Sequence, residues 1–370
     1  MVIKPFACLV IYGGSMFGLF ASKGPFNANI SPAGDTIKVE AGDNLLKAAL
    51  ANGLPWPNNC RVGSCGECRC RLVKGNIKPL SDFSYVLDGQ ELDDGMILAC
   101  QTSLRSDVEI EVNYVKSSKS LSIPKSIDGI ISDIKDLTHD IREVTVKLDQ
   151  AIPPYLAGQY ADFSVPGQIE KPRSYSFASA PTNENIDEIK FHIRHVPNGE
   201  MTTWIHQENR INNRVKVAGP YGNFWLRDIK TPIICVAGGS GMAPIKALLE
   251  EIQSLGFGNK VVYLFGARTM SDLYCLDEMK QLVENSKGNF EFIPILSREP
   301  EESSWTGLRG QITEFITPNV IDLPKCHAYL CGPPAMIDAA VLKLEDGGID
   351  KANIFFDKFL DASTIPGGRS

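Results

Sequence analysis

The spacing of apolar and polar positions along the chain changes its period twice. Residues 27–114 contain short stretches in which apolar and polar side chains alternate, as in strands with one buried face. Longer alternating stretches follow, among them IREVTVKL, QYADFSV and IKFHIRHV, and they predict a small antiparallel β-barrel. From residue 229, continuous apolar runs such as PIICVAG alternate with helical patterns such as APIKALLEEIQSL, which predicts a doubly wound parallel α/β sheet.

These changes divide the chain into three units, which we place at residues 25–114, 127–228 and 229–370. A length of 370 residues suits this number of domains. The segment 115–126, VKSSKSLSIPKS, has several serines and lysines and no acidic residue, as expected for a solvated linker. In the first unit, two strands, a helix capped by Asp43, a long loop and a closing strand follow one another. That order is typical of a β-grasp fold.

Four cysteines have the spacing of an iron–sulfur site. Cys60, Cys65 and Cys68 form a C-x4-C-x2-C run, and Cys100 follows after a long gap. A plant-type [2Fe–2S] cluster has this pattern, in which a tight loop supplies three thiolates and a distant segment supplies the fourth. Zinc sites usually show two matched C-x2-C pairs, whereas one is present here. Cys70 lies two residues beyond Cys68 on an expected strand, and we predict that it packs in the domain.

Composition and charge restrict the partners and the compartment. The net charge is −7 and no basic stripe is present, which argues against a nucleic-acid partner. Ten irregularly placed cysteines in a long chain do not indicate a disulfide framework, and they suit a reducing compartment. We therefore expect a cytoplasmic protein.

Residues 1–24 form an apolar N-terminal arm. The stretch from Phe6 to Ser22 is uncharged and contains three glycines, and it falls short of the ~20 apolar residues of a spanning helix. A signal peptide has a similar pattern, but export would separate a cluster protein from cytoplasmic reductant. Two interpretations stay open, namely contact with the inner face of the cytoplasmic membrane and packing of the arm on its own protein.

The barrel region carries residues suited to a ligand with a pyrophosphate and a flat ring. Arg173, Ser174, Tyr175 and Ser176 lie on an expected strand. An arginine can pair a pyrophosphate, and a tyrosine two residues further on shares its face and can stack on a ring. The adjacent serine can hydrogen-bond a ring nitrogen. Taken alone, the tetrapeptide is also compatible with an ordinary barrel strand.

A short helix is expected downstream in GEMTTW. Gly199 permits a sharp turn, and Met201 and Thr202 open the helix. The first N–H groups and hydroxyls of such a helix suit a phosphate. A plain capped helix explains the same residues.

Two glycine-containing loops follow apolar strands of the third unit. The first, in GGSGMAP, consists of Gly238, Gly239, Ser240 and Gly241 and opens a helix. The second, CGPPAM, begins with Cys331 and Gly332. Both loops are expected at the carboxyl ends of strands, where open α/β sheets bind nucleotides.

Together these motifs resemble a known family. A plant-type cluster loop, a barrel strand with RSYS, and a sheet with GGSGMAP and CGPPAM are similar, in this order, to the ferredoxin–NADH reductase fusions of bacterial oxygenases. The resemblance covers residues 27 to 360, including GARTMSDLYCLDEM and SSWTGLRGQITEF. It implies FAD in the barrel and NADH on the parallel sheet, in a fold arrangement like that of ferredoxin-NADP reductase.

The resemblance also implies roles for individual residues. Arg173, with Ser174 beside it, would hold the FAD pyrophosphate, Tyr175 would stack on the isoalloxazine, and Ser176 would lie near N5. Other residues would bind the FAD phosphates, namely Gly199, Met201 and Thr202.

On the nicotinamide side, the resemblance implies that Gly238 to Gly241 face the NADH pyrophosphate and that Cys331 with Gly332 lies near the nicotinamide. Phe359 would cover the other face of the flavin. Tyr175, Ser176 and Cys331 are thereby the expected catalytic residues. Arg268 and Asp272 follow the second strand, and an acid with a single arginine favours the free 2′-hydroxyl of NADH over a 2′-phosphate.

The function implied is electron transfer from NADH through FAD to the cluster and on to an oxygenase. A membrane-bound monooxygenase hydroxylase is the expected acceptor, because the apolar arm would bring the cluster domain to the bilayer. Three alternatives stay open. They are a subunit of the sodium-translocating NADH:quinone reductase, the reductase of a soluble ring-hydroxylating dioxygenase, and a redox sensor.

Overall fold

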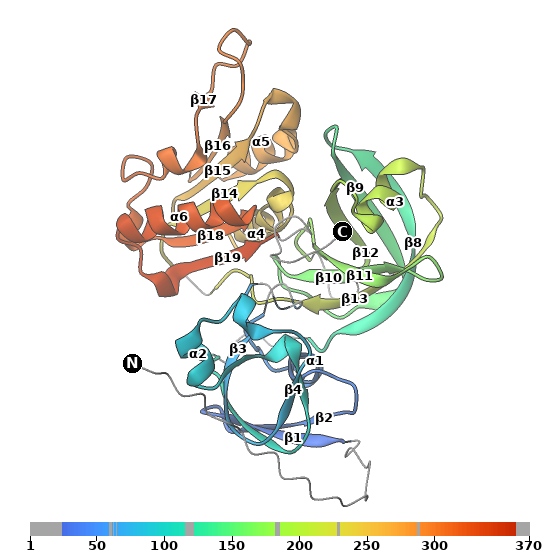
Figure 1. Ribbon diagram of the computed structural model, residues 1–370. Helices are drawn as coiled ribbons and strands as arrows, with labels where there is room; N and C mark the ends of the chain where they lie inside the picture. The colour runs from blue at the N-terminus through green and yellow to red at the C-terminus, as the bar shows by residue number, and fades with distance from the viewer. Residues whose placement is uncertain are drawn as a thin grey trace, which may run out of the picture.

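The computed structural model describes residues 24–58, 61, 63, 65–114, 122–181, 186–227, 230–286 and 289–359. They form three units (Figure 1), with the first at the bottom of the view, the barrel at the right and the parallel sheet at the upper left. The expected N-terminal arm, apart from Gly24, and the candidate ligand Cys60 lie outside the described residues.

The first unit is built on a mixed sheet with strand order β2-β1-β7-β3-β5. Its strands are β1 (Phe26–Ser31), β2 (Asp35–Val39), β3 (Arg69–Lys74), β5 (Met96–Leu98) and β7 (Val108–Glu111), beside a separate pair, β4 (Ile77–Pro79) and β6 (Thr102–Leu104). Helix α1 (Leu45–Ala51) packs its buried leucines and alanines against this sheet around Trp56. The parallel β1–β7 pair between antiparallel neighbours gives the expected β-grasp arrangement.

Three short helical segments connect these strands, namely η1 (Phe83–Tyr85), α2 (Gly89–Asp93) and η2 (Ala99–Gln101). The cap of α1 differs from the expectation. Asn44 is the capping residue and its side chain accepts from Lys47 N at 2.7 Å, whereas Asp43 pairs with Lys47 Nζ at 2.6 Å. Either side chain can cap a helix, and the chain turns into helical geometry one residue later than the sequence predicts.

The second unit is a curled six-stranded antiparallel sheet with strand order β11-β10-β13-β8-β9-β12. The strands are β8 (Lys125–Asp136), β9 (Ile141–Ile152), β10 (Tyr160–Val165), β11 (Ile169–Ser176), β12 (Ile186–Arg194) and β13 (Arg214–Tyr221). A bridge between Phe177 and Phe191 brings the two edges together, so the sheet closes on an aromatic and aliphatic core. Helix α3 (Glu200–Gln207) begins where the sequence predicts it. Strand β8 takes in the last two residues of the expected linker.

The third unit is a parallel sheet with strand order β17-β16-β15-β14-β18-β19. The strands are β14 (Ile233–Gly238), β15 (Val261–Ala267), β16 (Phe290–Leu296), β17 (Leu308–Arg309), β18 (His327–Gly332) and β19 (Ile354–Lys358). Helices α4 (Met242–Ser254) and α5 (Leu276–Asn285) cover one face, and α6 (Pro334–Asp346) covers the other. The expected helix around Gln311–Thr317 is only a 3-10 segment, η5 (Ile312–Phe315).

The strands of this sheet are added first on one side of β14 and then on its other side. From β14 the chain builds outward through β15, β16 and β17, then returns to place β18 and β19 on the other side. Such a switch point leaves a crevice at the carboxyl ends of the two central strands. The two glycine-containing loops both lie there, as predicted, because Ala237 and Cys331 are neighbours in the register.

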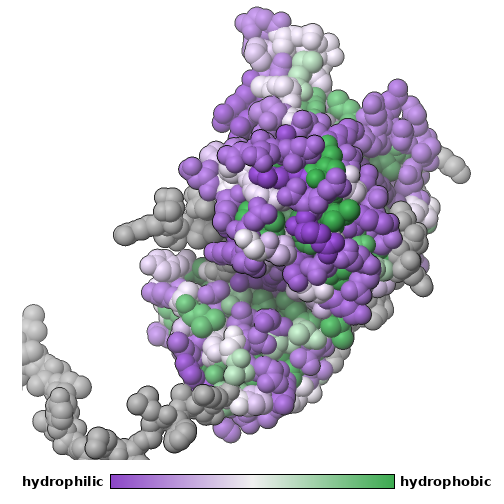
Figure 2. Space-filling view, turned by 90° about the vertical axis from the view of Figure 1, so that its right-hand side faces the viewer, coloured by the Kyte–Doolittle hydropathy of each residue, from purple (hydrophilic) through white to green (hydrophobic). Residues whose placement is uncertain are grey.

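Hydrophilic side chains predominate on the face shown in Figure 2, and an indentation separates the lower unit from the upper mass. Among the helices that the structure describes, none is both long and apolar enough to cross a membrane.

Candidate functional site

The structure brings the C-x2-C arm of the cluster loop next to the distant Cys100. Cys68 and Cys100 are buried, Cys65 is half-buried, and none of these three forms a disulfide. Ala99 N donates to Cys68 O at 3.1 Å, which ties η2 to the loop. Gly63 has φ +82°, and a Cβ there would lie 2.6 Å from Gln101 Cγ, so the loop can pack this closely only with glycine.

Cys70 has the core position expected of it. It lies on β3, is almost fully buried and belongs to the apolar core of the first unit. Burial, with a smaller effect of Cys68, raises the pKa of its thiol well above the usual value. A protonated thiol is a poor metal ligand, which suits a packing role for Cys70.

The RSYS strand lies against β10 in a regular register. Arg173 and Tyr175 share one face, as predicted, opposite Phe163 and Ala161. The ring of Tyr175 contacts Phe163 at 6.2 Å between centroids, and burial raises the pKa of its hydroxyl, which stays protonated. Arg173 Nη1 donates to the carbonyls of Lys171 and Pro172, each at 3.2 Å.

The two serines of this strand lie on its other face. Ser174 Oγ donates to Asp162 Oδ1 at 2.8 Å, and Ser176 is buried opposite Tyr160. The hydroxyl of Ser174 is therefore used within the protein. Ser176 is the last residue of β11, and the carbonyl of Ala178, two residues further on, accepts from Lys246 of the third unit.

The start of α3 offers backbone groups rather than side chains to a phosphate. Met201 is packed in the barrel core, and Thr202 Oγ1 accepts from Val196 N at 3.1 Å and lies 3.2 Å from Val196 O. Gly199 is the N-cap residue and supplies no side chain, and a Cβ there would lie 2.6 Å from Thr202 Oγ1. The first N–H groups of the helix are thus the groups of this segment that could bind a phosphate.

The two glycine-containing loops touch each other at the switch point. A Cβ on Gly241 would overlap the carbonyl oxygen of Cys331, and one on Gly332 would lie 2.9 Å from Gly238 O. Gly239, Ser240 and Gly241 form η3, which leads into α4. Cys331 is fully buried, and burial raises the pKa of its thiol well above the usual value. Phe359 N donates to Gly332 O at 2.9 Å, so the late aromatic residue lies beside this loop.

A cleft of about 200 Å³ opens between the barrel and the parallel sheet. Its lining residues come from both units: Asp140, Ile141 and Arg194 from the barrel, and Gly238, Gly239, Gly266, Ala267, Arg268, Asp272, Ile295, Ser297, Gly310, Gln311, Ile312, Pro333 and Met336 from the sheet. The cleft therefore contains the predicted Gly238, Gly239 and Arg268. It also contains barrel residues that the sequence did not single out.

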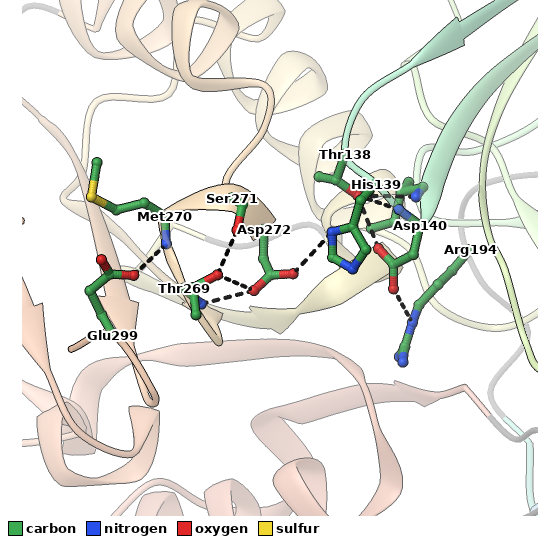
Figure 3. A network of polar contacts seen from close by, with 10 residues as sticks. Thr138, His139, Asp140, Arg194, Thr269, Met270, Ser271, Asp272 and Glu299 are labelled. Atoms are coloured by element: carbon green, nitrogen blue, oxygen red, sulfur yellow. Dashed lines mark hydrogen bonds and ion pairs between the residues drawn. The ribbon is translucent and has the colours of Figure 1, made fainter. Parts of the chain in front are cut away.

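Figure 3 shows how the polar side chains meet at the wall of this cleft. Asp272 Oδ2 accepts from Thr269 N at 2.8 Å, and its Oδ1 lies 3.7 Å from His139 Nδ1 across the gap between the units. On the barrel side, Arg194 Nε donates to Asp140 Oδ2 at 3.1 Å. One carboxylate oxygen of Asp272 thus caps η4 (Met270–Asp272), and the other points towards the barrel.

A second polar contact joins the barrel to the third unit. Lys246 Nζ, on α4, donates to Ala178 O at 3.2 Å and to Glu250 Oε1 at 2.5 Å, and Glu250 accepts from Ala180 N at 2.8 Å. This network holds the segment after β11 against α4. The sequence offered no signal for it, since a lysine and a glutamate four apart on a helix usually face solvent.

Nearby, the barrel carries a buried His192–Glu143 pair with Nε2 and Oε2 3.3 Å apart. The hydrogen bond from His192 lowers the pKa of Glu143 to about 2, and burial lowers the pKa of His192. The pair is thus a carboxylate accepting from a neutral imidazole. The imidazole ring packs edge-on against Tyr274 of the third unit, with centroids 5.5 Å apart.

The cluster loop also contacts the barrel, through Arg61. Its guanidinium pairs with Asp162 and lies over the ring of Tyr221, with Cζ 4.1 Å from the centroid. Burial on its own would lower the pKa of Arg61, but the neighbouring Tyr160, Asp162 and Tyr221 raise it overall. The sequence could not identify this contact, because Arg61 and Asp162 lie far apart in the chain.

Family models match each unit in turn. Residues 28–105 match the 2Fe-2S iron-sulfur cluster binding domain, residues 128–225 the oxidoreductase FAD-binding domain, and residues 235–341 the oxidoreductase NAD-binding domain. The chain is 37% identical to the xylene/toluene monooxygenase electron transfer component XylA of Pseudomonas putida, over 92% of this chain and 96% of that protein. The chain belongs to the ferredoxin–NADH reductase components of bacterial oxygenases.

Other members of this family are similar over comparable lengths. The phenol 2-monooxygenase reductase component DmpP of Pseudomonas sp. (strain CF600) is 32% identical, covering 93% of this chain and 97% of its own. The reductase component of the naphthalene 1,2-dioxygenase system of Pseudomonas putida is also 32% identical, covering 92% and 98%. The structure of the Amycolatopsis cytochrome P450 reductase GcoB aligns with a TM-score of 0.81 at 28% identity, covering 90% of this chain and 98% of that one.

As a ferredoxin–NADH reductase, the protein takes a [2Fe–2S] cluster, FAD and NAD, and the residues in place suit all three. The cluster loop supplies thiols that form no disulfide around glycines with positive φ. The barrel presents an arginine with a partly exposed guanidinium and the N–H groups of α3. The sheet presents a crevice in which backbone groups approach closely because the loops lack side chains.

Proposed function

We propose that this protein is the NADH-dependent electron-transfer component of a monooxygenase system, in which electrons pass from NADH through FAD and the [2Fe–2S] cluster to a separate hydroxylase. One observation carries the proposal. The barrel that bears the RSYS strand forms the cleft with the NAD-binding sheet and, at Asp162, contacts the loop of the cluster domain. A nicotinamide site and a cluster site thus adjoin the same flavin domain.

The division of chemistry between the cofactors and the protein follows from these sites. A bound flavin takes the two electrons of NADH as a hydride and passes them on singly, as a [2Fe–2S] cluster requires. We assign Arg173 and the N–H groups of α3 to the FAD phosphates. Tyr175 and Ser176 would position the flavin ring, and Tyr175 stays a neutral hydroxyl because burial raises its pKa.

The nicotinamide is assigned to the crevice beside Gly332 and Cys331, with the pyrophosphate over Gly238 to Gly241. Cys331 is a protonated thiol in the core of the third unit, so its contribution is shape and exclusion of water rather than proton transfer. Phe359 is assigned to cover the flavin, which its hydrogen bond to Gly332 supports. Four cysteines, Cys60, Cys65, Cys68 and Cys100, are assigned to the cluster.

A membrane-bound hydroxylase is the acceptor that we favour. The identity to XylA supports a monooxygenase as the partner, and the uncharged stretch between Lys4 and Lys23 is our support for placing that partner at the membrane. The 32% identity to a naphthalene dioxygenase reductase component supports a dioxygenase as the second candidate acceptor, for which the apolar arm would not be needed. Fractionation of cells that make the full chain or a chain without residues 1–24 separates the two. Recovery in the membrane fraction only with these residues supports the first, and recovery of both chains in the supernatant supports the second.

Steady-state turnover tests the electron-transfer function itself. With cytochrome c as acceptor, one NADH should yield NAD⁺, one proton and two reduced cytochromes, at a constant rate over many turnovers. A redox sensor would stop once its own cofactors were reduced. Absence of sustained NADH oxidation by protein loaded with both cofactors would contradict the proposal.

A further inference from the structure

Arg61 joins the cluster loop to the flavin domain. It directly follows the candidate ligand Cys60, yet the partners found for its guanidinium lie on the barrel. They are Asp162 on β10, Tyr221 at the end of β13 and, at 5.6 Å, the ring of Tyr160. The side chains of Arg61 and Asp162 are only 22% and 10% exposed, so the pair is sheltered from solvent.

The position of Asp162 connects this contact to the RSYS strand. Asp162 pairs with Ser174 in the β10–β11 register, and its Oδ1 accepts from Ser174 Oγ at 2.8 Å. Tyr160, two residues before it, lies opposite Ser176. Arg61 therefore contacts β10 beside the two serines of the strand that is assigned to the flavin.

The backbone at Arg61 is consistent with a role for its side chain. Its φ is +55°, in the left-handed region that glycine occupies without strain. The same loop has glycine at Gly63 and Gly66, both with positive φ. An arginine in such a conformation is strained, and it persists only if its contacts offset that strain.

Two further hydrogen bonds join the first unit to the barrel. Tyr160 Oη donates to Asn58 Oδ1 at 3.2 Å, and Asn223 Nδ2 donates to Trp56 O at 2.9 Å. Hydrogen bonds and one ion pair fix an orientation more than they add affinity. A contact of this kind can hold the cluster loop in one pose against the barrel and still allow it to separate.

We propose that Arg61, through Asp162, is a positioning residue that holds the cluster loop against the flavin strand in the orientation needed for electron transfer between the two cofactors. The step concerned moves one electron, originally from NADH, from the reduced flavin to the oxidised cluster, and no bond is made or broken. The inference rests on the proposed function, because it concerns the flavin-to-cluster step within it.

Two single variants test the charge and the geometry of the Arg61–Asp162 pair separately. Asp162→Asn leaves the loop untouched and keeps an acceptor for Ser174 but removes the ionic partner of Arg61. Arg61→Lys keeps the charge and loses the planar fork that pairs with a carboxylate and stacks on Tyr221. The double variant Arg61→Asp with Asp162→Arg restores a pair with reversed charges. Arg71→Ala is the matched control, because Arg71 pairs with Glu111 inside the first unit.

Stopped-flow absorbance on the fully loaded protein follows flavin reduction by NADH and the subsequent reduction of the cluster. We expect Asp162→Asn and Arg61→Lys to slow the second phase roughly tenfold, since a sheltered ion pair loses its partner or its geometry. NADH-to-ferricyanide activity, KM for NADH, and flavin and iron content should stay as in the unmodified protein. The swapped pair should recover part of the rate, and Arg71→Ala should change nothing.

Small-angle scattering gives a readout independent of turnover. Both single variants should show a larger radius of gyration in the oxidised protein, because the first unit is less firmly held, and the swapped pair should return towards the original value. Unchanged flavin-to-cluster rates and unchanged scattering in Asp162→Asn would overturn the proposal. If NADH failed to reduce the cluster in the unmodified protein, the proposed function would fail instead, whatever the variants do.

Discussion

At the scale of single residues, burial does not separate the cysteines of the cluster domain, but their place in the fold does. Cys68, Cys70 and Cys100 all belong to the apolar core of this unit, and Cys65 is half-buried. Cys68 lies on the cluster loop and Cys100 on η2, which a backbone hydrogen bond joins to that loop, whereas Cys70 lies on β3. The loop position therefore distinguishes the candidate iron ligands from Cys70.

Replacing Cys100 tests this distinction. Cys100→Ser should abolish the EPR signal of the reduced [2Fe–2S] cluster but leave NADH-to-ferricyanide activity, because the flavin domain is unaffected. Cys70→Ala is the control and should keep the signal, at a stability cost of about 1 kcal/mol from a small core cavity. Survival of the signal in Cys100→Ser would show that the fourth ligand is misassigned.

The raised pKa of Cys331 leads to a pH prediction. Because the folded protein favours the neutral thiol, the group stays protonated as the pH rises through 9. The pH profile of NADH-to-ferricyanide activity should therefore show the same alkaline limb in Cys331→Ala as in the original protein. The number of thiols that react with a thiol reagent in the native state should also be equal. A thiol ionisation that disappears from the profile in Cys331→Ala would contradict this account.

Arg173 offers a test of the flavin assignment. Arg173→Ala should lower the FAD content of the purified protein, because a charge-assisted contact to a pyrophosphate is lost. Lys171→Ala, on the same exposed end of β11, is the matched control and should bind FAD normally. Equal FAD content in both variants would remove Arg173 from the site.

At the scale of elements, the alternation of apolar and polar positions was sufficient to predict the order of the barrel strands and of the strand–helix units. The alternation was insufficient to predict which residue caps a helix or whether a short segment forms an α-helix or a 3-10 turn. Asn44 rather than Asp43 caps α1, because both residues are good caps and the backbone decides between them. The region of Ile312 forms only a 3-10 turn, since its apolar residues pack onto the sheet without a full helical face.

The site was predictable to the extent that its residues lie in local motifs. The loops at Gly238 and Cys331 were expected at the same sheet edge, and the register of β14 and β18 puts them there. Arg61, Asp140 and Arg194 were not predictable, because each acts through a contact with a residue distant in sequence. Nothing in the periodicity of a strand specifies such a partner.

The contact between the two loops gives a prediction for the element scale. Gly241→Ala would place a methyl group against the backbone carbonyl of Cys331, which cannot move without separating β14 from β18. Overpacking of this kind costs about 1–3 kcal/mol, so KM for NADH should rise roughly tenfold while the cluster EPR signal is kept. Gly258→Ala, where nothing lies within 4 Å of the new Cβ, is the control. Equal KM values for the two variants would place the dinucleotide elsewhere.

At the scale of the whole molecule, the barrel is the unit that both others contact. It meets the parallel sheet through Lys246, Glu250 and the cleft wall. It meets the cluster domain through Arg61 and through hydrogen bonds to Asn58 and Trp56. The side chains of Lys246 and Glu250 are 10% and 30% exposed, and those of Arg61 and Asp162 are 22% and 10% exposed. Both contacts are therefore largely sheltered from solvent, and the barrel holds a neighbour on each side.

The proposed function requires that electrons from NADH reach the cluster through the flavin within one chain. Anaerobic mixing of the loaded protein with NADH, followed by rapid freezing and EPR, measures this path. We expect the flavin to be reduced first and the signal of a reduced [2Fe–2S] cluster then to grow to about one spin per chain. A flavin fully reduced by NADH beside a cluster that stays oxidised would show that electrons do not take this path.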